Sequence, residues 1–203
     1  MKIFFERFWY LLWKDNSFKG WLLSLIVIFV FIKFIFFPLL SLATGTSLPL
    51  AIVESCSMYH QGNVFSIFSN WWEKYDGKYA SMGIDESEFS KFIFRRGFSK
   101  GDILFIVRAR PEKIKIGDII IFNVNQQTPI IHRVMNITQK DGVYFFSTMG
   151  DNNNGQLSFE KEINEDRVMG KAVFRIVPYI GWAKLVFFEG QKPINERGFC
   201  KEN

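Results

Sequence analysis

Hydrophobic and polar positions divide the chain into stretches with three different patterns. A continuous apolar run occupies residues 21–42, an aromatic-rich stretch with helical spacing occupies 61–98, and short apolar runs between turn residues fill 99–190. A continuous run predicts a buried or membrane-spanning helix, helical spacing predicts amphipathic helices, and short runs between turns predict strands. The pattern therefore predicts one apolar helix followed by a domain that is mainly β.

The run from Trp21 to Leu42 has the length of a membrane-spanning helix. All of its residues are apolar except Ser24, Lys33, Pro38 and Ser41. At 1.5 Å per residue, such a helix spans roughly 33 Å, which matches the hydrocarbon core of a bilayer. The run is longer than the apolar part of a signal peptide and begins only at residue 21. We therefore expect a permanent anchor rather than a cleaved leader.

Basic residues set the expected orientation of this anchor. Four of them precede the run, and after it no Lys or Arg occurs until Lys74. The positive-inside rule then places residues 1–20 in the cytoplasm and everything after the run on the outer face of the cell membrane, in a single-pass topology. Residues 3–13 mix bulky apolar and charged side chains, as in a helix lying in the membrane interface. A simple extension of the anchor is the alternative.

The outer region predicts a small sheet or barrel with a helical insertion. Runs rich in β-branched and aromatic residues alternate with Gly, Pro, Asn and Asp. The expected strands are 102–107, 118–124, 128–134, 142–149 and 170–177, after a short apolar run at 48–53. Residues 61–98 predict one or two amphipathic helices, since bulky residues recur there at helical spacing: Phe65, Phe68, Trp71, Trp72, Phe89, Phe92 and Ile93. These helices could lie on the membrane surface, gate the substrate, or form a lid on the β domain.

Composition excludes several kinds of site. The chain has 2 Cys and 2 His, too few for a disulfide scaffold, a cysteine-built zinc site or a multi-histidine metal site. We expect neither a metal nor a cofactor. The net charge of +5 is spread along the chain without a basic stripe, so nucleic acid is not an expected partner.

Three short motifs carry the candidate chemistry. They are Ser55-x-Ser57-Met58, Ile131-His132-Arg133-Val134 and Gly150-Asp151-Asn152-Asn153. A serine is a weak nucleophile until a base takes its proton, and histidine can be that base near neutral pH. A carboxylate on the other imidazole nitrogen orients the base, so Ser57, His132 and Asp151 could supply all three roles. Each motif alone also fits ordinary structure, because loop serines, packed histidines and Asp-Asn turns are common.

The three motifs follow one another in this order after a predicted membrane anchor. This arrangement resembles type I signal peptidase, in the archaeal and endoplasmic-reticulum branch of the S26 serine peptidases. Gly117–Ile120, Gly170-Lys171 and Pro178–Trp182 belong to the same resemblance. Bacterial members carry a lysine base before the Arg-Val pair, whereas this chain has His132. The resemblance implies a signal-peptidase-like β catalytic domain that removes N-terminal signal peptides from secreted precursors after Ala-x-Ala-like sites.

The resemblance also implies a role for each site residue. Ser57 would form an acyl-enzyme, with His132 as the base that activates first Ser57 and then a water. The Ser57 backbone N–H and the Ser55 hydroxyl would form the oxyanion hole. The substrate would lie as an added strand against two edges of the sheet, formed by Ile52, Val53 and Glu54 and by the segment before His132 that contains Ile130.

Implied partners are signal peptides of secretory preproteins and the lipid bilayer, with protein translocation machinery as a further candidate. The expected organisation is a cytoplasmic N-terminus, an anchor, a serine segment, a helical insertion, a β-rich catalytic domain and a polar tail: 1–20, 21–42, 43–60, 61–98, 99–190 and 191–203.

Departures from the family pattern leave alternatives open. Cys56 stands where the family usually has glycine, so a cysteine nucleophile and a Cys56–Cys200 disulfide are both conceivable. His60, three residues from Ser57, is an alternative base. Leu157 stands where this branch often has a second Asp, which leaves Glu160 as an alternative to Asp151 for orienting the histidine. These departures also motivate a rival reading, a non-catalytic membrane subunit that binds signal peptides or serves a secretion complex.

Overall fold

Two compact units make up the chain, residues 1–45 and residues 46–203. The computed structural model describes residues 6, 9–10, 13–15, 17–61, 68–124 and 129–201. Most of the predicted interface helix at 3–13, together with Phe65, lies outside the described residues.

The first unit contains one long apolar helix, as predicted. It runs without a break through α2 (Phe18–Phe31), the π-helical segment η1 (Ile32–Phe36) and α3 (Phe37–Thr44). The side chain of Ser17 caps its start, and Gly45 ends it with a left-handed φ of 68°. The wider turns of η1 come just before Pro38, which has no amide hydrogen to donate. The 27-residue helix is long and apolar enough to cross a membrane, and its most apolar window is 0% buried.

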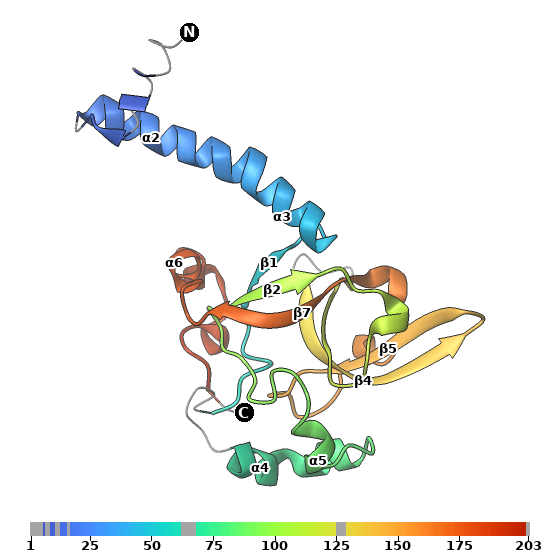
Figure 1. The fold of residues 1–203 in the computed structure, drawn as a ribbon. Helices are drawn as coiled ribbons and strands as arrows, with labels where there is room; N and C mark the ends of the chain where they lie inside the picture. The colour runs from blue at the N-terminus through green and yellow to red at the C-terminus, as the bar shows by residue number, and fades with distance from the viewer. Residues whose placement is uncertain are drawn as a thin grey trace. The chain divides into compact units, whose positions relative to one another are not determined.

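One antiparallel sheet that curls into a half-barrel forms the second unit (Figure 1). Its strands pair in the order β1-β2-β7-β3-β4-β5-β6. They are β1 (Leu50–Ile52), β2 (Ile103–Val107), β3 (Ile119–Phe122), β4 (Ile130–Lys140), β5 (Val143–Met149), β6 (Ile163–Asn164) and β7 (Val168–Val177). The prediction of a mainly β domain is confirmed, and each predicted strand is present.

Two details of the sheet differ from the prediction. The strand expected to end at Val134 continues to Lys140, because a tight turn at Asp141 and Gly142, both with positive φ, joins β4 directly to β5. The short strand β6 lies at one edge of the sheet and was not predicted. Its two residues are too few to show a period in the sequence.

Consecutive side chains of β4 enter two different parts of the core, because strand residues alternate between faces. Val134 packs in a cluster with Ile120, Phe122 and Phe146. The next residue, Met135, packs in another cluster with aromatic residues of the helical insertion and with a β5 residue: Trp71, Trp72, Tyr79, Phe89 and Met149.

Helices α4 (Phe68–Ala80) and α5 (Glu86–Phe89) form the insertion, as the helical spacing predicts (Figure 1). Their buried aromatic side chains pack against Met135 and Met149 of the sheet. The insertion therefore forms a lid on the β domain. Short helical segments complete the second unit: η2 (Pro111–Lys113), η3 (Ser158–Glu160), η4 (Glu165–Arg167), α6 (Trp182–Leu185), η5 (Glu189–Gln191) and η6 (Ile194–Glu196).

Candidate active site

Ser57 lies in a tight turn that follows β1. The chain still pairs with its neighbour at Val53, whose amide donates to the Asp102 carbonyl at 2.9 Å. It then turns, and the amide of Tyr59 donates to the carbonyl of Cys56 at 3.1 Å. The hydroxyls of Ser55 and Ser57 lie 3.1 Å apart and share a hydrogen bond. The two serines of the motif therefore present their side chains together.

The loop after β5 holds this turn from one side. The backbone amide of Asn152 donates to the carbonyl of Ser57 at 2.7 Å, and its side-chain amide donates to the carbonyl of Cys56 at 3.1 Å. A side chain at Gly150 would place its Cβ 2.8 Å from the Ser57 carbonyl, so only glycine permits this approach. The Gly-Asp-Asn motif thus positions the serine turn, a role that its turn-forming composition alone does not reveal.

On β4, His132 forms a buried hydrogen-bonded pair with the carboxylate of Glu160, the last residue of η3. The ring is 4% exposed, and its Nδ1 donates to Oε1 of Glu160, which is fully buried. The same carboxylate accepts from the Thr148 hydroxyl at 3.2 Å and from the Leu157 amide at 2.8 Å. Glu160 is therefore held by three donors, and it fixes the tautomer in which Nε2 of His132 is free to accept a proton.

Strand register brings the serine turn to the neighbourhood of His132. Arg133 pairs with Met149, so Gly150 comes next to His132 in the antiparallel register. Gly150 is the residue that approaches the Ser57 carbonyl. Within the described residues, the Ser57 hydroxyl bonds to Ser55 and not to His132. Catalytic hydrogen bonds are often long or absent before substrate binds.

The hydrogen bonds that the described residues make to the Asp151 carboxylate come from Arg133, His60 and Tyr79 and not from His132. The carboxylate forms a bidentate pair with the guanidinium of Arg133, at 3.0 and 2.6 Å. Arg133 is the next residue on β4 and points to the opposite face, where three backbone carbonyls occupy its other donors: Ile93, Gly117 and Phe94. Burial alone would raise the pKa of Asp151, but Arg133 and His60 lower it far below its usual value.

His60 belongs to this buried cluster. Its Nε2 lies 3.0 Å from Asp151, and its ring stacks on Trp71 at 3.6 Å. Burial lowers the pKa of His60 below 6.5, which favours the neutral ring. The alternative base of the sequence analysis thus faces Asp151 in the structure.

The insertion contributes two further polar side chains that the sequence did not single out. The hydroxyl of Tyr79 donates to the Asp151 carboxylate at 3.0 Å. Lys78 donates to the backbone carbonyls of Asp151 and Asn153, and burial lowers its pKa to about 8. Both residues lie on α4, so the insertion is bonded to the loop that holds the serine turn.

Among the residues that the structure describes, two stretches of strand next to the site have an unpaired edge. β1 ends the sheet order and pairs only with β2. The carbonyls of Pro49 and Val53 face β2, so those of Ile52 and Glu54 face the open side. On β4, Ile130 pairs with β3 alone, because pairing with β5 begins at Arg133. The predicted substrate-binding residues Ile52 and Ile130 therefore lie at open edges, whereas the Glu54 carbonyl accepts from the Lys192 ammonium at 2.7 Å. The Val53 side chain is buried.

Comparison with known proteins identifies relatives, although no family model matches. The human signal peptidase complex catalytic subunit SEC11C is 34% identical over 100 residues, which are 44% of this chain and 50% of the relative. The signal peptidase complex catalytic subunit sec11 of Dictyostelium discoideum is 30% identical over 99 residues, 45% of this chain and 54% of the relative. SEC11 of Lodderomyces elongisporus is 33% identical over 100 residues, covering 46% and 60%.

This chain is homologous to the catalytic subunits of signal peptidase. The resemblance drawn from the three motifs is thereby confirmed. The chain spans about half the length of the curated relatives it matches. No group of three or more potential metal ligands is found among the residues that the structure describes.

Proposed function

We propose that this signal peptidase homologue is a membrane-anchored serine endopeptidase that removes signal peptides from secreted precursors. The buried His132–Glu160 pair, next to a turn that presents two serine hydroxyls, carries the proposal. Such a pair supplies an oriented base, and the turn supplies a nucleophile with a second hydroxyl beside it.

The proposed reaction follows from this arrangement. Ser57 Oγ attacks the scissile carbonyl carbon while Nε2 of His132 takes the hydroxyl proton. The negative charge on the substrate oxygen is stabilised by the Ser57 amide and the Ser55 hydroxyl. Collapse breaks the peptide bond, and His132 returns the proton to the departing amine. Water, deprotonated by His132, then hydrolyses the acyl-enzyme. Glu160 accepts the hydrogen bond from Nδ1 and holds the imidazolium in both steps.

Substrate selection would use the open edges of the sheet. An extended peptide can add a strand beside Ile52 and Glu54 on one side and Ile130 on the other. Ala-x-Ala-like sites are the cleavage sites that the resemblance to type I signal peptidase implies.

The helix Phe18–Thr44 supports a membrane location for this reaction. An N-terminus in the cytoplasm and a catalytic domain on the outer face of the cell membrane follow from the basic residues before the helix. Signal peptides would then be cut where their apolar run ends, beside the translocation machinery.

A second candidate function is a non-catalytic subunit that binds signal peptides. It is favoured by one observation, the hydrogen bond of the Ser57 hydroxyl to Ser55 rather than to His132. The same open edges would bind the peptide without cutting it.

Cleavage by the protein in liposomes separates the two functions. A preprotein with an Ala-x-Ala site is incubated with wild type, with Ser57→Ala, and with Ser81→Ala, an exposed serine that follows α4. We expect wild type and Ser81→Ala to release the mature protein and Ser57→Ala to release none. Cleavage by Ser57→Ala would refute the serine mechanism. Crosslinking of the precursor to an inactive wild type would support the binding subunit.

A further inference from the structure

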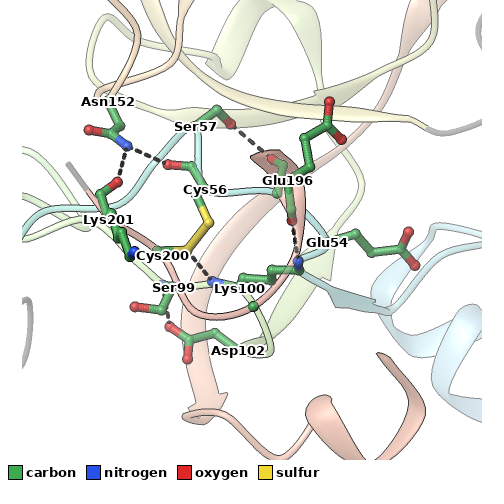
Figure 2. The surroundings of a disulfide bond; sticks show 12 residues. Glu54, Cys56, Ser57, Ser99, Lys100, Asp102, Asn152, Glu196, Cys200 and Lys201 are labelled. Atoms are coloured by element: carbon green, nitrogen blue, oxygen red, sulfur yellow. Dashed lines mark hydrogen bonds between the residues drawn. A yellow bond between two sulfur atoms is a disulfide. The ribbon is translucent and has the colours of Figure 1, made fainter. Parts of the chain in front are cut away.

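The C-terminal segment returns to the serine turn and is joined to it by a disulfide (Figure 2). Cys56 lies between the two serines of the motif, and its sulfur is bonded to that of Cys200, 144 residues later. The Cα atoms of the two cysteines are 5.3 Å apart. Of the two alternatives for Cys56, a nucleophile or a disulfide, the structure contains the disulfide. This disulfide lies within the candidate site.

Asn152 joins the same two segments by hydrogen bonds. Its side-chain amide donates both to the Cys56 carbonyl and to the Lys201 carbonyl, each at 3.1 Å (Figure 2). Its backbone amide holds the Ser57 carbonyl at 2.7 Å. One residue of the Gly-Asp-Asn motif therefore contacts the nucleophile turn and the chain end together.

The buried side chain of Lys100 also binds the C-terminal segment. Its side chain, 1% exposed, donates to the carboxylate of Glu189 and to the carbonyl of Glu196, each at 2.8 Å. Its backbone amide donates to Cys200 Sγ at 3.4 Å (Figure 2). The course of residues 189–201 is therefore set by contacts along its length and not by the disulfide alone.

Lys192 adds a contact on the other side of the turn. Its ammonium donates to the carbonyl of Glu54 at 2.7 Å. That carbonyl faces the open edge of β1, two residues before Cys56. The C-terminal segment thus holds the chain both before and within the serine motif.

We infer that residues 189–201 are a positioning strap, and that its Cys56–Cys200 disulfide holds Ser57 in place for acylation. The inference rests on the proposed peptidase function. Ser57 sits in irregular backbone beyond the end of a strand, where the sheet ladder no longer restrains it. The loop of Asn152 restrains one side, and the disulfide restrains the residue directly before Ser57. A displacement of about 1 Å at a reacting atom is enough to cost about a hundredfold in rate.

Cys200→Ala tests this role, because it removes the covalent bond between the C-terminal segment and Cys56 of the serine turn. Phe199→Ala is the matched control: it removes a ring that is 71% exposed and packs on Trp182 at 4.9 Å, but it leaves the disulfide intact. Precursor cleavage is measured as separate kcat and KM values, beside the thermal midpoint. We expect Cys200→Ala to lower kcat by about tenfold or more with little change in KM, and Phe199→Ala to leave kcat close to wild type.

Chemical reduction of the folded wild type gives a second route that does not depend on refolding a variant. A dithiol reductant is oxidised to its own disulfide while the Cys56–Cys200 bond takes up two electrons and two protons and becomes two thiols. We expect kcat to fall on reduction and to return on reoxidation, whereas Cys56→Ser/Cys200→Ser should not respond.

The outcomes distinguish this inference from the proposed function. Cleavage by wild type with an unchanged kcat after reduction, or in folded Cys200→Ala, would overturn the strap alone. A rise in KM with unchanged kcat would also overturn it, because the segment would then bind substrate rather than position Ser57. No cleavage by wild type would overturn the proposed function and this inference with it.

Discussion

Nδ1 of His132 donates a hydrogen bond to Oε1 of Glu160, a carboxylate that is fully buried beneath the strand. The neighbouring residue, Arg133, binds the carboxylate of Asp151 on the other face of β4. The two acids of this region are thus separated by one strand. Glu160 is hydrogen-bonded to the proposed base, and Asp151 neutralises a buried guanidinium.

Glu160→Gln should lower kcat by about 10² to 10⁴, since the amide cannot stabilise the imidazolium that forms in each step. KM should change little, because Glu160 is buried and does not face the open strand edges. Steady-state cleavage of the precursor measures both constants. Glu162→Gln is the matched control, as its side chain is 55% exposed and pairs with Lys140 at the surface. Activity of Glu160→Gln within threefold of the control would contradict the assigned role.

Asp151→Asn should act on stability first. It leaves the fully buried guanidinium of Arg133 without a counter-charge, which costs about 3–5 kcal/mol of the free energy of unfolding. Urea unfolding at neutral pH, with Glu162→Gln as the exposed control, measures the difference. A loss below about 1 kcal/mol, with kcat reduced, would instead favour a catalytic role for Asp151.

The sequence predicted every strand except β6, the apolar helix and the motifs of Ser57 and His132, because each of these shows in the local pattern or in short spacing. The partner of His132 stayed open between Asp151 and Glu160 at the level of sequence. Position 157 lacks the acid expected from the resemblance. The Glu160 carboxylate reaches the His132 ring because of the path of η3 and because it accepts a hydrogen bond from the Leu157 amide. Alternation along the predicted strand already places His132 and Arg133 on opposite faces.

The path of the polar tail could not be predicted from the local sequence pattern either. Residues 191–203 show no hydrophobic period in the sequence. The course of residues 191–201 is set by a disulfide to Cys56 and by Lys100, both distant in sequence. Cysteine spacing alone does not fix a pairing.

Stability should fall in mild acid because of His60. Its pKa in the folded protein lies below the value of 6.5 for an exposed histidine, so the unfolded chain binds more protons as the pH drops below 6.5. The free energy of unfolding should therefore be highest above pH 6.5 and decline toward pH 5. Asp151, with its lowered pKa, adds a similar loss only at much lower pH.

Urea midpoints of wild type and His60→Gln between pH 7.5 and pH 5 test this dependence. The wild-type midpoint should decline over that range, and the variant should show a flatter curve even where it is less stable overall. Parallel curves for the two proteins would show that His60 does not cause the decline.

Reduction of the Cys56–Cys200 disulfide should destabilise the fold as well as slow the reaction. The bond closes a loop across 144 residues, and removal of a native disulfide typically costs about 2–5 kcal/mol. Thermal unfolding with and without reductant measures this cost. The Cys56→Ser/Cys200→Ser variant should give the same midpoint in both conditions, and a wild-type midpoint that does not move would rule out a closed disulfide.

Covalent trapping measures directly whether His132 activates Ser57 as the nucleophile. Wild type, His132→Ala and Ser57→Ala are treated in liposomes with a serine-directed acylating probe, and the modified peptide is identified by mass spectrometry. We expect an adduct on Ser57 in wild type, labelling slower by at least about a hundredfold in His132→Ala, and no labelling in Ser57→Ala. An adduct on another residue, or equal labelling of Ser57 with and without His132, would contradict this mechanism.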